Sequence, residues 1–184
     1  MNNQTANNQT AIKGLDEVSV MTFRKPVSTD GQPLNQLVDR CPPLDSNSTY
    51  CNLLQCTHFA DTSIAAVNSD DELVGFISGY IPPSRPNTLF VWQVAVDASC
   101  RGQGLALRML MALIERCRNE KSISYIETTI TPGNTASEAL FTRAYQQLNA
   151  PIEKTVLFSR KTHFADLHDD EMLWRGGPLE DQLS

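Results

Sequence analysis

Hydrophobic and polar positions change their spacing several times along the chain, which predicts a mixed order of helices and strands. Apolar residues recur every three or four positions at Leu107, Leu110, Met111, Ile114 and Cys117. This spacing lines one face of a helix, so we expect an amphipathic helix over 105–121. Alternating or β-branched runs predict strands at 18–24, 62–68, 73–81, 89–96 and 125–130.

Breaker and capping residues set the remaining helix boundaries. The run Cys41-Pro42-Pro43 separates two expected helices, at 29–40 and 49–59, because proline ends a helix. A further helix is expected at 135–148, directly after Asn134, since asparagine is a preferred N-cap residue.

The rest of the chain is consistent with one domain. Segment 153–179 is expected to add one or two strands with an irregular insert. The length of 184 residues suffices for one sizeable core. Neither a repeat nor a low-complexity linker divides the sequence. We therefore expect a single α/β domain over 17–180, preceded by a disordered tail at 1–16.

Composition and charge narrow the class of protein. Hydrophobic residues make up 41% and charged residues 20% of the chain, as in ordinary globular domains. The sequence holds no apolar run near the ~18 residues that a membrane span needs, and residues 1–10 do not resemble a signal peptide. The net charge of −6 argues against nucleic acid or an anionic membrane as a partner. We expect a cytoplasmic protein.

The cysteines and histidines do not predict a metal or disulfide site. The five cysteines are odd in number and form no Cys-x-x-Cys pair, so reduced thiols are expected. The three histidines do not stand at zinc-site spacing from them. No metal is predicted, and no ordered Cys/His pair indicates a catalytic thiol.

The segment with the clearest chemistry joins the strand at 89–96 to the helix at 105–121. Its loop reads Arg101-Gly102-Gln103-Gly104-Leu105-Ala106. Small side chains let an anion approach the backbone, and the first turn of the helix offers free N–H groups and the positive end of the helix dipole. A diphosphate suits this geometry. A plain strand-to-helix turn is the alternative, since Gly-x-Gly is common. A P-loop would need Gly-Lys-Ser/Thr, and a dinucleotide fold would need GxGxxG, and both are absent.

The arrangement Arg-x-x-Gly-x-Ala between a Val-rich strand and a Leu-rich helix resembles motif A of the GNAT acetyltransferase superfamily. The resemblance implies the GNAT fold, an α/β architecture with one mixed, mostly antiparallel sheet flanked by helices. It also implies that acetyl-CoA is the co-substrate. The residues implied to hold its pyrophosphate and pantetheine arm are Val94, Val96, Arg101, Gly102, Gln103, Gly104, Leu105 and Ala106.

Segment 129–141 is similar to motif B of the same superfamily. Asn134 stands where an asparagine bonds the cofactor arm, although it also fits a simple helix cap. Phe141 stands where many members have a tyrosine that protonates the departing thiolate. Because phenylalanine cannot donate a proton, the usual acid is missing.

Several longer runs resemble one group within the superfamily, the diaminobutyrate acetyltransferases of ectoine biosynthesis. These runs are Thr22-Phe-Arg-Lys-Pro-Val27, Cys41-Pro-Pro-Leu-Asp-Ser-Asn-Ser-Thr-Tyr50, Phe90-Val-Trp-Gln-Val-Ala-Val96, Thr131-Pro-Gly-Asn134 and His168-Asp-Asp-Glu-Met172. The resemblance covers about residues 20–179. It implies acetyl transfer to the side-chain (N4) amine of L-2,4-diaminobutyrate, and it suggests a homodimer, as do the apolar residues around 156–158.

By the same resemblance, Asp45, Tyr50 and Trp92 are candidate substrate-binding residues, and Glu171 and His168 are candidate catalytic residues. Asp45 and Glu171 would pair with ammonium groups, and Trp92 would offer cation–π attraction. Glu171, directly or through His168 or water, would remove the proton.

Simpler structural roles remain open for each candidate. Asp45 could cap the following helix, Tyr50 and Trp92 could be core residues, and His168 and Glu171 could belong to a solvated acidic surface.

Two other functions also remain open. One is a GNAT enzyme for another amine, such as a polyamine or a protein lysine. The other is a non-catalytic module that binds coenzyme A.

Overall fold

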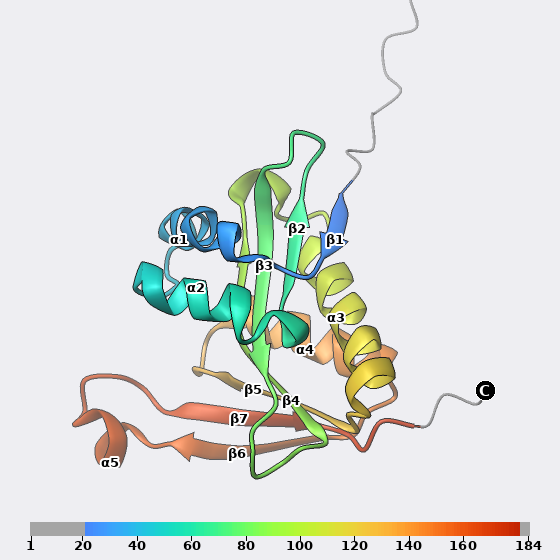
Figure 1. Ribbon diagram of the computed structural model, residues 1–184. Coiled ribbons are helices and arrows are strands. Elements are labelled where there is room, and N and C mark those ends of the chain that lie inside the picture. The colour runs from blue at the N-terminus through green and yellow to red at the C-terminus, as the bar shows by residue number, and fades with distance from the viewer. Residues whose placement is uncertain (1–20, 181–184) are drawn as a thin grey trace, which may run out of the picture.

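The frame of the molecule is a single seven-stranded sheet, and the computed structural model describes residues 21–180 of the chain. The expected tail at 1–16 lies outside the described residues. The strands are β1 (Thr22–Arg24), β2 (Ile64–Val67), β3 (Leu73–Tyr80), β4 (Thr88–Val96), β5 (Tyr125–Ile130), β6 (Ile152–Phe158) and β7 (Glu171–Gly176). Their order in the sheet is β1-β2-β3-β4-β5-β7-β6 (Figure 1). Among these seven strands only β4 and β5 pair in parallel, so the predicted mixed, mostly antiparallel sheet is confirmed.

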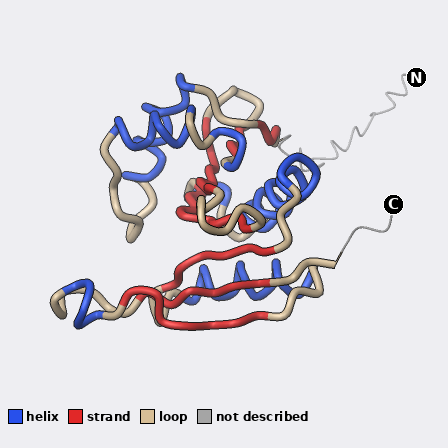
Figure 2. Tube along the Cα trace, turned by 60° about the horizontal axis from the view of Figure 1, so that its bottom comes forward, coloured by secondary structure: helices blue, strands red, loops and turns tan. Residues whose placement is uncertain are grey.

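Helices cover both faces of this sheet. They are α1 (Gly31–Asp39), α2 (Thr49–Thr57), α3 (Leu105–Lys121), α4 (Thr135–Gln147) and α5 (Arg160–Phe164). In Figure 1, α1 and α2 lie on one side of β2–β4 and α3 lies on the other. Figure 2 shows α4 behind β5, β7 and β6. The expected helix at 105–121 matches α3 at both ends.

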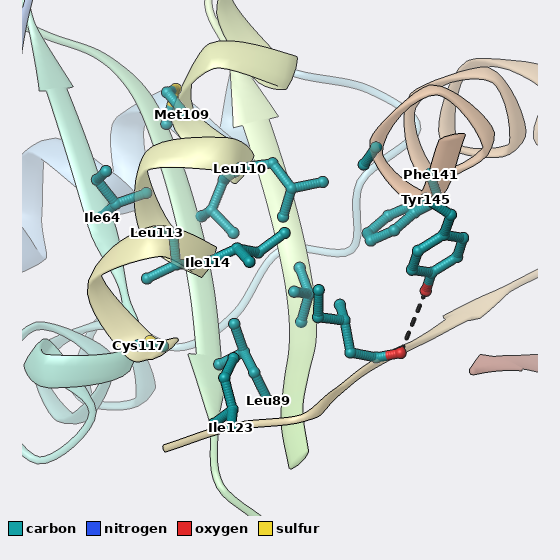
Figure 3. Packing of buried hydrophobic residues seen from close by; sticks show 14 of the residues in the cluster. Ile64, Leu89, Met109, Leu110, Leu113, Ile114, Cys117, Ile123, Phe141 and Tyr145 are labelled. Carbon is teal, nitrogen blue, oxygen red and sulfur yellow. Dashed lines mark hydrogen bonds between the residues drawn. The ribbon is translucent and has the colours of Figure 1, made fainter. Parts of the chain in front are cut away.

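Helix α3 is the centre of the larger hydrophobic core. Met109, Leu110, Leu113, Ile114 and Cys117 are fully buried (Figure 3). The predicted face included Leu107 and Met111, which are only half-buried and lie at the margin of the core. The buried face of α3 is therefore rotated from the predicted one, because the helix contacts both the sheet and α4.

Tyr145 fastens α4 to the second half of the sheet. Its side chain is fully buried, and its hydroxyl donates to the carbonyls of Ile126 at 3.4 Å and Trp174 at 3.3 Å. Figure 3 draws one of these two bonds. A Cβ at Gly176 would overlap the Tyr145 ring, so a glycine is needed where α4 crosses β7.

Several element boundaries differ from those expected. Of the strand expected at 18–24, only Thr22–Arg24 forms β1, and 18–20 lie outside the described residues. The second expected helix ends at Thr57 and not at 59. Thr62 lies in a 3-10 turn, where its hydroxyl donates to Gly79 O at 2.7 Å instead of starting β2. The strands expected in 153–179 are confirmed as β6 and β7, with α5 as the insert.

A buried ion cluster ties β5 to its neighbours. Glu127 is only 1% exposed and accepts from Arg85 Nη2 at 2.9 Å and from Arg175 Nη1. Arg85 comes from the loop before β4, and Arg175 lies opposite Glu127 on β7. Because a buried carboxylate without partners would be strongly destabilising, this cluster fixes the base of β4, β5 and β7 together.

Candidate active site

The sheet opens between β4 and β5. The two strands pair only from Thr88↔Tyr125 to Val91↔Thr128. Beyond that point β4 continues beside β3 to Val96, and β5 continues beside β7 to Ile130. Within residues 21–180, the second half of β4 therefore has a strand on one edge only. Backbone N–H and C=O groups on its other edge are available to a ligand.

A β-bulge marks the start of this opening. Gly79 pairs with Val91 and Ser78 pairs with Gln93, so Trp92 is the extra residue of β4. At the bulge the Gln93 backbone N–H donates to the Ser78 hydroxyl at 3.2 Å. Trp92 is 47% exposed, and the alternative that it belongs to the core is wrong.

The loop between β4 and α3 has the backbone conformation that an anion site needs. Gly102 has a φ of +75° and Gly104, the N-cap of α3, has a φ of +71°. A Cβ at either position would meet no other atom, so the space above the loop is open. The first-turn N–H groups of α3 have no partner within the helix. Asp97 lies just before this loop and accepts a hydrogen bond from the Ser99 backbone N–H at 3.0 Å. Hydrogen bonds from Ser99 hold the pKa of the Asp97 carboxyl below its usual range.

A cleft of about 270 Å³ extends from this loop to α4. Its lining includes most of the predicted cofactor residues, namely Val96, Arg101, Gly102, Gly104, Leu105 and Ala106. From α4 it adds Ala136, Ala139, Leu140 and Arg143, which were not predicted. These four lie at spacings of three, one and three residues, so they share one helix face. That spacing was visible in the sequence, but only the fold turns the face toward the loop.

The other predicted cofactor residues lie beside this cleft. The side chain of Val94 packs against the α3 core. Gln103 donates to Ser99 O at 3.0 Å and lines a separate hollow next to α1. Asn134 accepts from Ser137 N at 3.1 Å, which confirms its role as the N-cap of α4. Arg101 folds back, with Nε donating to Val96 O at 3.0 Å.

The loop between α1 and α2 is attached to β4 next to the bulge. Gln93 Nε2 donates to Asp45 O at 3.1 Å, and Gln93 Oε1 accepts from Asn47 Nδ2 at 3.1 Å. Asn35 of α1 also holds this loop, donating to Asn47 O at 3.0 Å. The backbone of the predicted substrate residue Asp45 is thereby held to Gln93, the residue that follows Trp92 in β4.

The simpler structural roles of Asp45 and Tyr50 are wrong. Ser48, not Asp45, caps α2, accepting from Cys51 N at 3.1 Å. The carboxylate of Asp45 is exposed. Tyr50 is 69% exposed and does not belong to the core.

Glu171 and His168 lie together where β7 begins. Thr131 Oγ1 donates to Glu171 Oε1 at 2.6 Å, and His168 Nε2 is 3.9 Å from the same oxygen. His168 Nδ1 is 2.7 Å from Asp169 O. Because a carbonyl only accepts, Nδ1 carries the proton and Nε2 faces Glu171. The Glu171 side chain is 18% exposed, so of this pair only His168, at 44%, fits a solvated surface.

The two groups of substrate candidates lie on the same side of the molecule. In Figures 1 and 2 the loop between α1 and α2 and the end of the β6–β7 hairpin both lie on the left. The arrangement thus offers carboxylates from two separate segments, with the open edge of β4 between the two halves of the sheet.

Cysteine chemistry has little support in this structure. Burial raises the pKa of Cys56 to about 12 and that of Cys117 to about 11, so both remain thiols at neutral pH. Among the described residues no three metal-ligating side chains converge. No described helix combines the length and apolar character that crossing a membrane requires.

Comparison with known proteins places this geometry in a family. The acetyltransferase (GNAT) family profile matches residues 32–145, which include the bulged strand, the glycine loop and most of α4. The chain belongs to the GNAT acetyltransferase family. Relatives of this acetyltransferase that are named L-2,4-diaminobutyric acid acetyltransferase come from Methylotuvimicrobium alcaliphilum and Streptomyces avermitilis. They are 52% and 48% identical, covering 88% and 84% of this chain and 92% and 87% of their own.

Solved structures agree with the fold of this acetyltransferase. The diaminobutyrate acetyltransferase EctA from Paenibacillus lautus, in complex with L-2,4-diaminobutyric acid and coenzyme A, superimposes with a TM-score of 0.81 at 36% identity. The match covers 90% of this chain and 99% of that one. The ribosomal-protein-S18-alanine N-acetyltransferase from Escherichia coli, at 13% identity and a TM-score of 0.66, shares the fold.

Phe141 of this acetyltransferase faces the core and does not line the cleft. It is 2% exposed, with its ring centroid 6.0 Å from that of Tyr145. Tyr145 is equally buried, and burial raises its pKa. The α4 helix therefore presents no phenol to the cleft among the residues that line it.

The attachment of the 45–47 loop to β4 can be tested with Gln93→Leu. This change removes both side-chain hydrogen bonds from Gln93 to the loop, worth about 1–3 kcal/mol together. We expect faster amide hydrogen exchange at 45–47 and unchanged exchange in α3, measured by mass spectrometry. Gln36→Leu, at an exposed position of α1, is the matched control and should leave exchange unchanged. Equal protection of the loop in both variants would contradict the attachment.

Proposed function

We propose that this chain transfers acetyl from acetyl-CoA to the N4 amine of L-2,4-diaminobutyrate, giving N4-acetyl-L-2,4-diaminobutyrate in ectoine biosynthesis. The observation that carries the proposal is the match to the Paenibacillus lautus enzyme, which holds this substrate and coenzyme A, over 90% of the chain. The positions of Asp45, Tyr50, Trp92 and Glu171 around the opened sheet support it, because a diamine needs carboxylates and an aromatic wall.

Coenzyme A fits the cleft between the glycine loop and α4. The diphosphate would accept from the first-turn N–H groups of α3, and Gly102 and Gly104 leave the space above them open. Arg143, at the cleft wall, would add positive charge. The edge of β4 from 92 to 96 would bond the pantetheine arm and polarise the thioester carbonyl. When bound, the cofactor supplies the acetyl thioester.

The amine substrate is held from two sides. The exposed carboxylate of Asp45 would pair with the α-ammonium group, and Tyr50 would hydrogen-bond the substrate. Trp92 would form the wall beside the bulge. Pinning the α-amine in this way leaves the N4 atom free to approach the thioester to ~3–3.5 Å, the near-attack range.

Glu171 is the proposed proton acceptor. The N4 amine is protonated at neutral pH, by analogy with lysine at a pKa of ~10.4, and must lose a proton before it can attack. The carbon–nitrogen bond then forms and the carbon–sulfur bond breaks, and the second proton of the nitrogen balances the departing thiolate. No side chain is assigned as the acid, because Phe141 and Tyr145 are buried away from the cleft.

We also propose that the protein is a homodimer and that it works in the cytoplasm. Strand β6 is one of the two edge strands of the described sheet, and its apolar residues Ile152, Val156 and Phe158 are 39%, 51% and 42% exposed. An edge strand with exposed apolar side chains is a natural contact for a second copy.

The activity can be tested by identifying the product. We expect the purified protein to acetylate L-2,4-diaminobutyrate mainly at N4, because positioning overrides the intrinsic preference for the less basic α-amine. Proton–nitrogen correlation NMR of the product distinguishes the two sites. Putrescine and lysine should react much more slowly. Acetylation mainly at the α-nitrogen, or an equal rate with putrescine, would refute the substrate assignment.

The diphosphate site can be tested at Gly104. Gly104→Val places a branched side chain above the loop at a positive φ, so coenzyme A affinity should fall by more than about tenfold. Gly104→Asn is the comparison, since asparagine tolerates this backbone conformation. It should melt like the wild type yet still bind more weakly, because its side chain enters the diphosphate's space. If calorimetry gave a folded Gly104→Val variant the wild-type affinity for coenzyme A, the loop could not be part of the cofactor site.

A further inference from the structure

A hydrogen bond between neighbouring strands fixes the orientation of Glu171. Antiparallel pairing of β5 and β7 runs up to Ile130↔Met172. The next step of the same register places Thr131 opposite Glu171, and Thr131 Oγ1 donates to Glu171 Oε1 at 2.6 Å. This length is typical of a hydroxyl bonded to a charged carboxylate. The sheet, and not a free surface rotamer, therefore sets the position of this carboxylate.

The bond gives the two oxygens of the Glu171 carboxylate different surroundings. Oε1 accepts from Thr131 and also faces His168 Nε2 at 3.9 Å. No further hydrogen bond to Oε2 is made within residues 21–180. With Oε1 held on its strand neighbour, Oε2 is the oxygen available to a substrate proton. Without the Thr131 hydroxyl, the Glu171 side chain could rotate, and Oε2 would no longer be held in position for the substrate.

Thr131 also connects Glu171 to the wall of the cofactor cleft. Thr131 O accepts from Asn134 N at 3.1 Å, closing the turn between β5 and α4. Asn134 in turn caps α4 through Ser137 N. The first turns of α4 supply Ala136 and Ala139 to the cleft. Thr131 thus links Glu171 to α4, the helix that lines the cofactor cleft.

We propose that Thr131 is a positioning residue that holds Glu171 for proton removal, an inference that rests on the proposed function. Glu171 Oε2 accepts one proton from the N4 ammonium group of the substrate, which leaves the neutral amine with its lone pair. Water then carries the proton from Oε2 to solvent or to the exposed imidazole of His168, whose Nε2 is free to accept because Nδ1 donates to Asp169 O. Thr131 keeps its own proton throughout and touches only the carboxylate.

The test compares substitutions that differ in the hydroxyl alone. Thr131→Val keeps the size and branching but removes the donor, so kcat should fall about tenfold. The KM for acetyl-CoA and the calorimetric affinity for coenzyme A should stay within about twofold. Thr131→Ser should restore kcat. Thr57→Val is the control: it removes an exposed hydroxyl that donates only to Leu53 O of its own helix, at 2.8 Å, and it should match the wild type in kcat.

A second measurement separates positioning from general disturbance. In the Glu171→Gln background, Thr131→Val should change kcat less than about twofold, because the group it positions is gone. If Thr131→Val does not fold, Thr131→Cys, a weak donor of similar size, replaces it.

Wild-type kcat in Thr131→Val, failure of Thr131→Ser to restore kcat, or an equal loss in both backgrounds would overturn the proposal. Should the Glu171→Gln activity be too low to measure, the comparison of valine with serine decides. If the wild-type protein itself does not acetylate diaminobutyrate, the proposed function fails, whatever Thr131 does.

Discussion

The pairing of β4 with β5 ends at Val91↔Thr128, and the rest of the site depends on that termination. Two strands that stayed paired to their ends would satisfy each other's backbone groups and leave no opening. Here β4 bends at the Trp92 bulge and follows β3, while β5 follows β7. The resulting opening separates the two halves of one sheet and gives a ligand access to strand backbone without a separate domain.

Two polar devices hold the opening in shape. At its base, buried Glu127 is paired with Arg85 and Arg175, so the three segments that meet there cannot part without exposing an unpaired buried charge. At its rim, Gln93 ties the loop that carries Asp45 to the bulged strand. Buried ion pairs hold the base of the opening, and hydrogen bonds of modest strength hold its rim.

The sequence predicted those features that depend on local pattern. The spacing of apolar residues predicted α3 with both of its ends correct, and Asn134 caps α4 as its residue type indicates. The glycines in the loop before α3 leave the space above the backbone open, as their small size suggested.

Features that depend on strand pairing could not be read from the sequence. The contact of Thr131 with Glu171 needs the register of two strands whose residues are 40 positions apart. The burial of Phe141 and the approach of Arg143 to the cleft depend on how α4 is rotated against the sheet. Local pattern places residues on elements, but only packing orients those elements toward each other.

We propose that acetyl passes directly from the thioester to the amine in the opening between β4 and β5. Initial rates measured over a grid of acetyl-CoA and diaminobutyrate concentrations test it most directly. Direct transfer predicts double-reciprocal lines that intersect, and an intact mass of the protein that is unchanged after incubation with acetyl-CoA alone. Parallel lines, or a protein mass raised by one acetyl group, would contradict it.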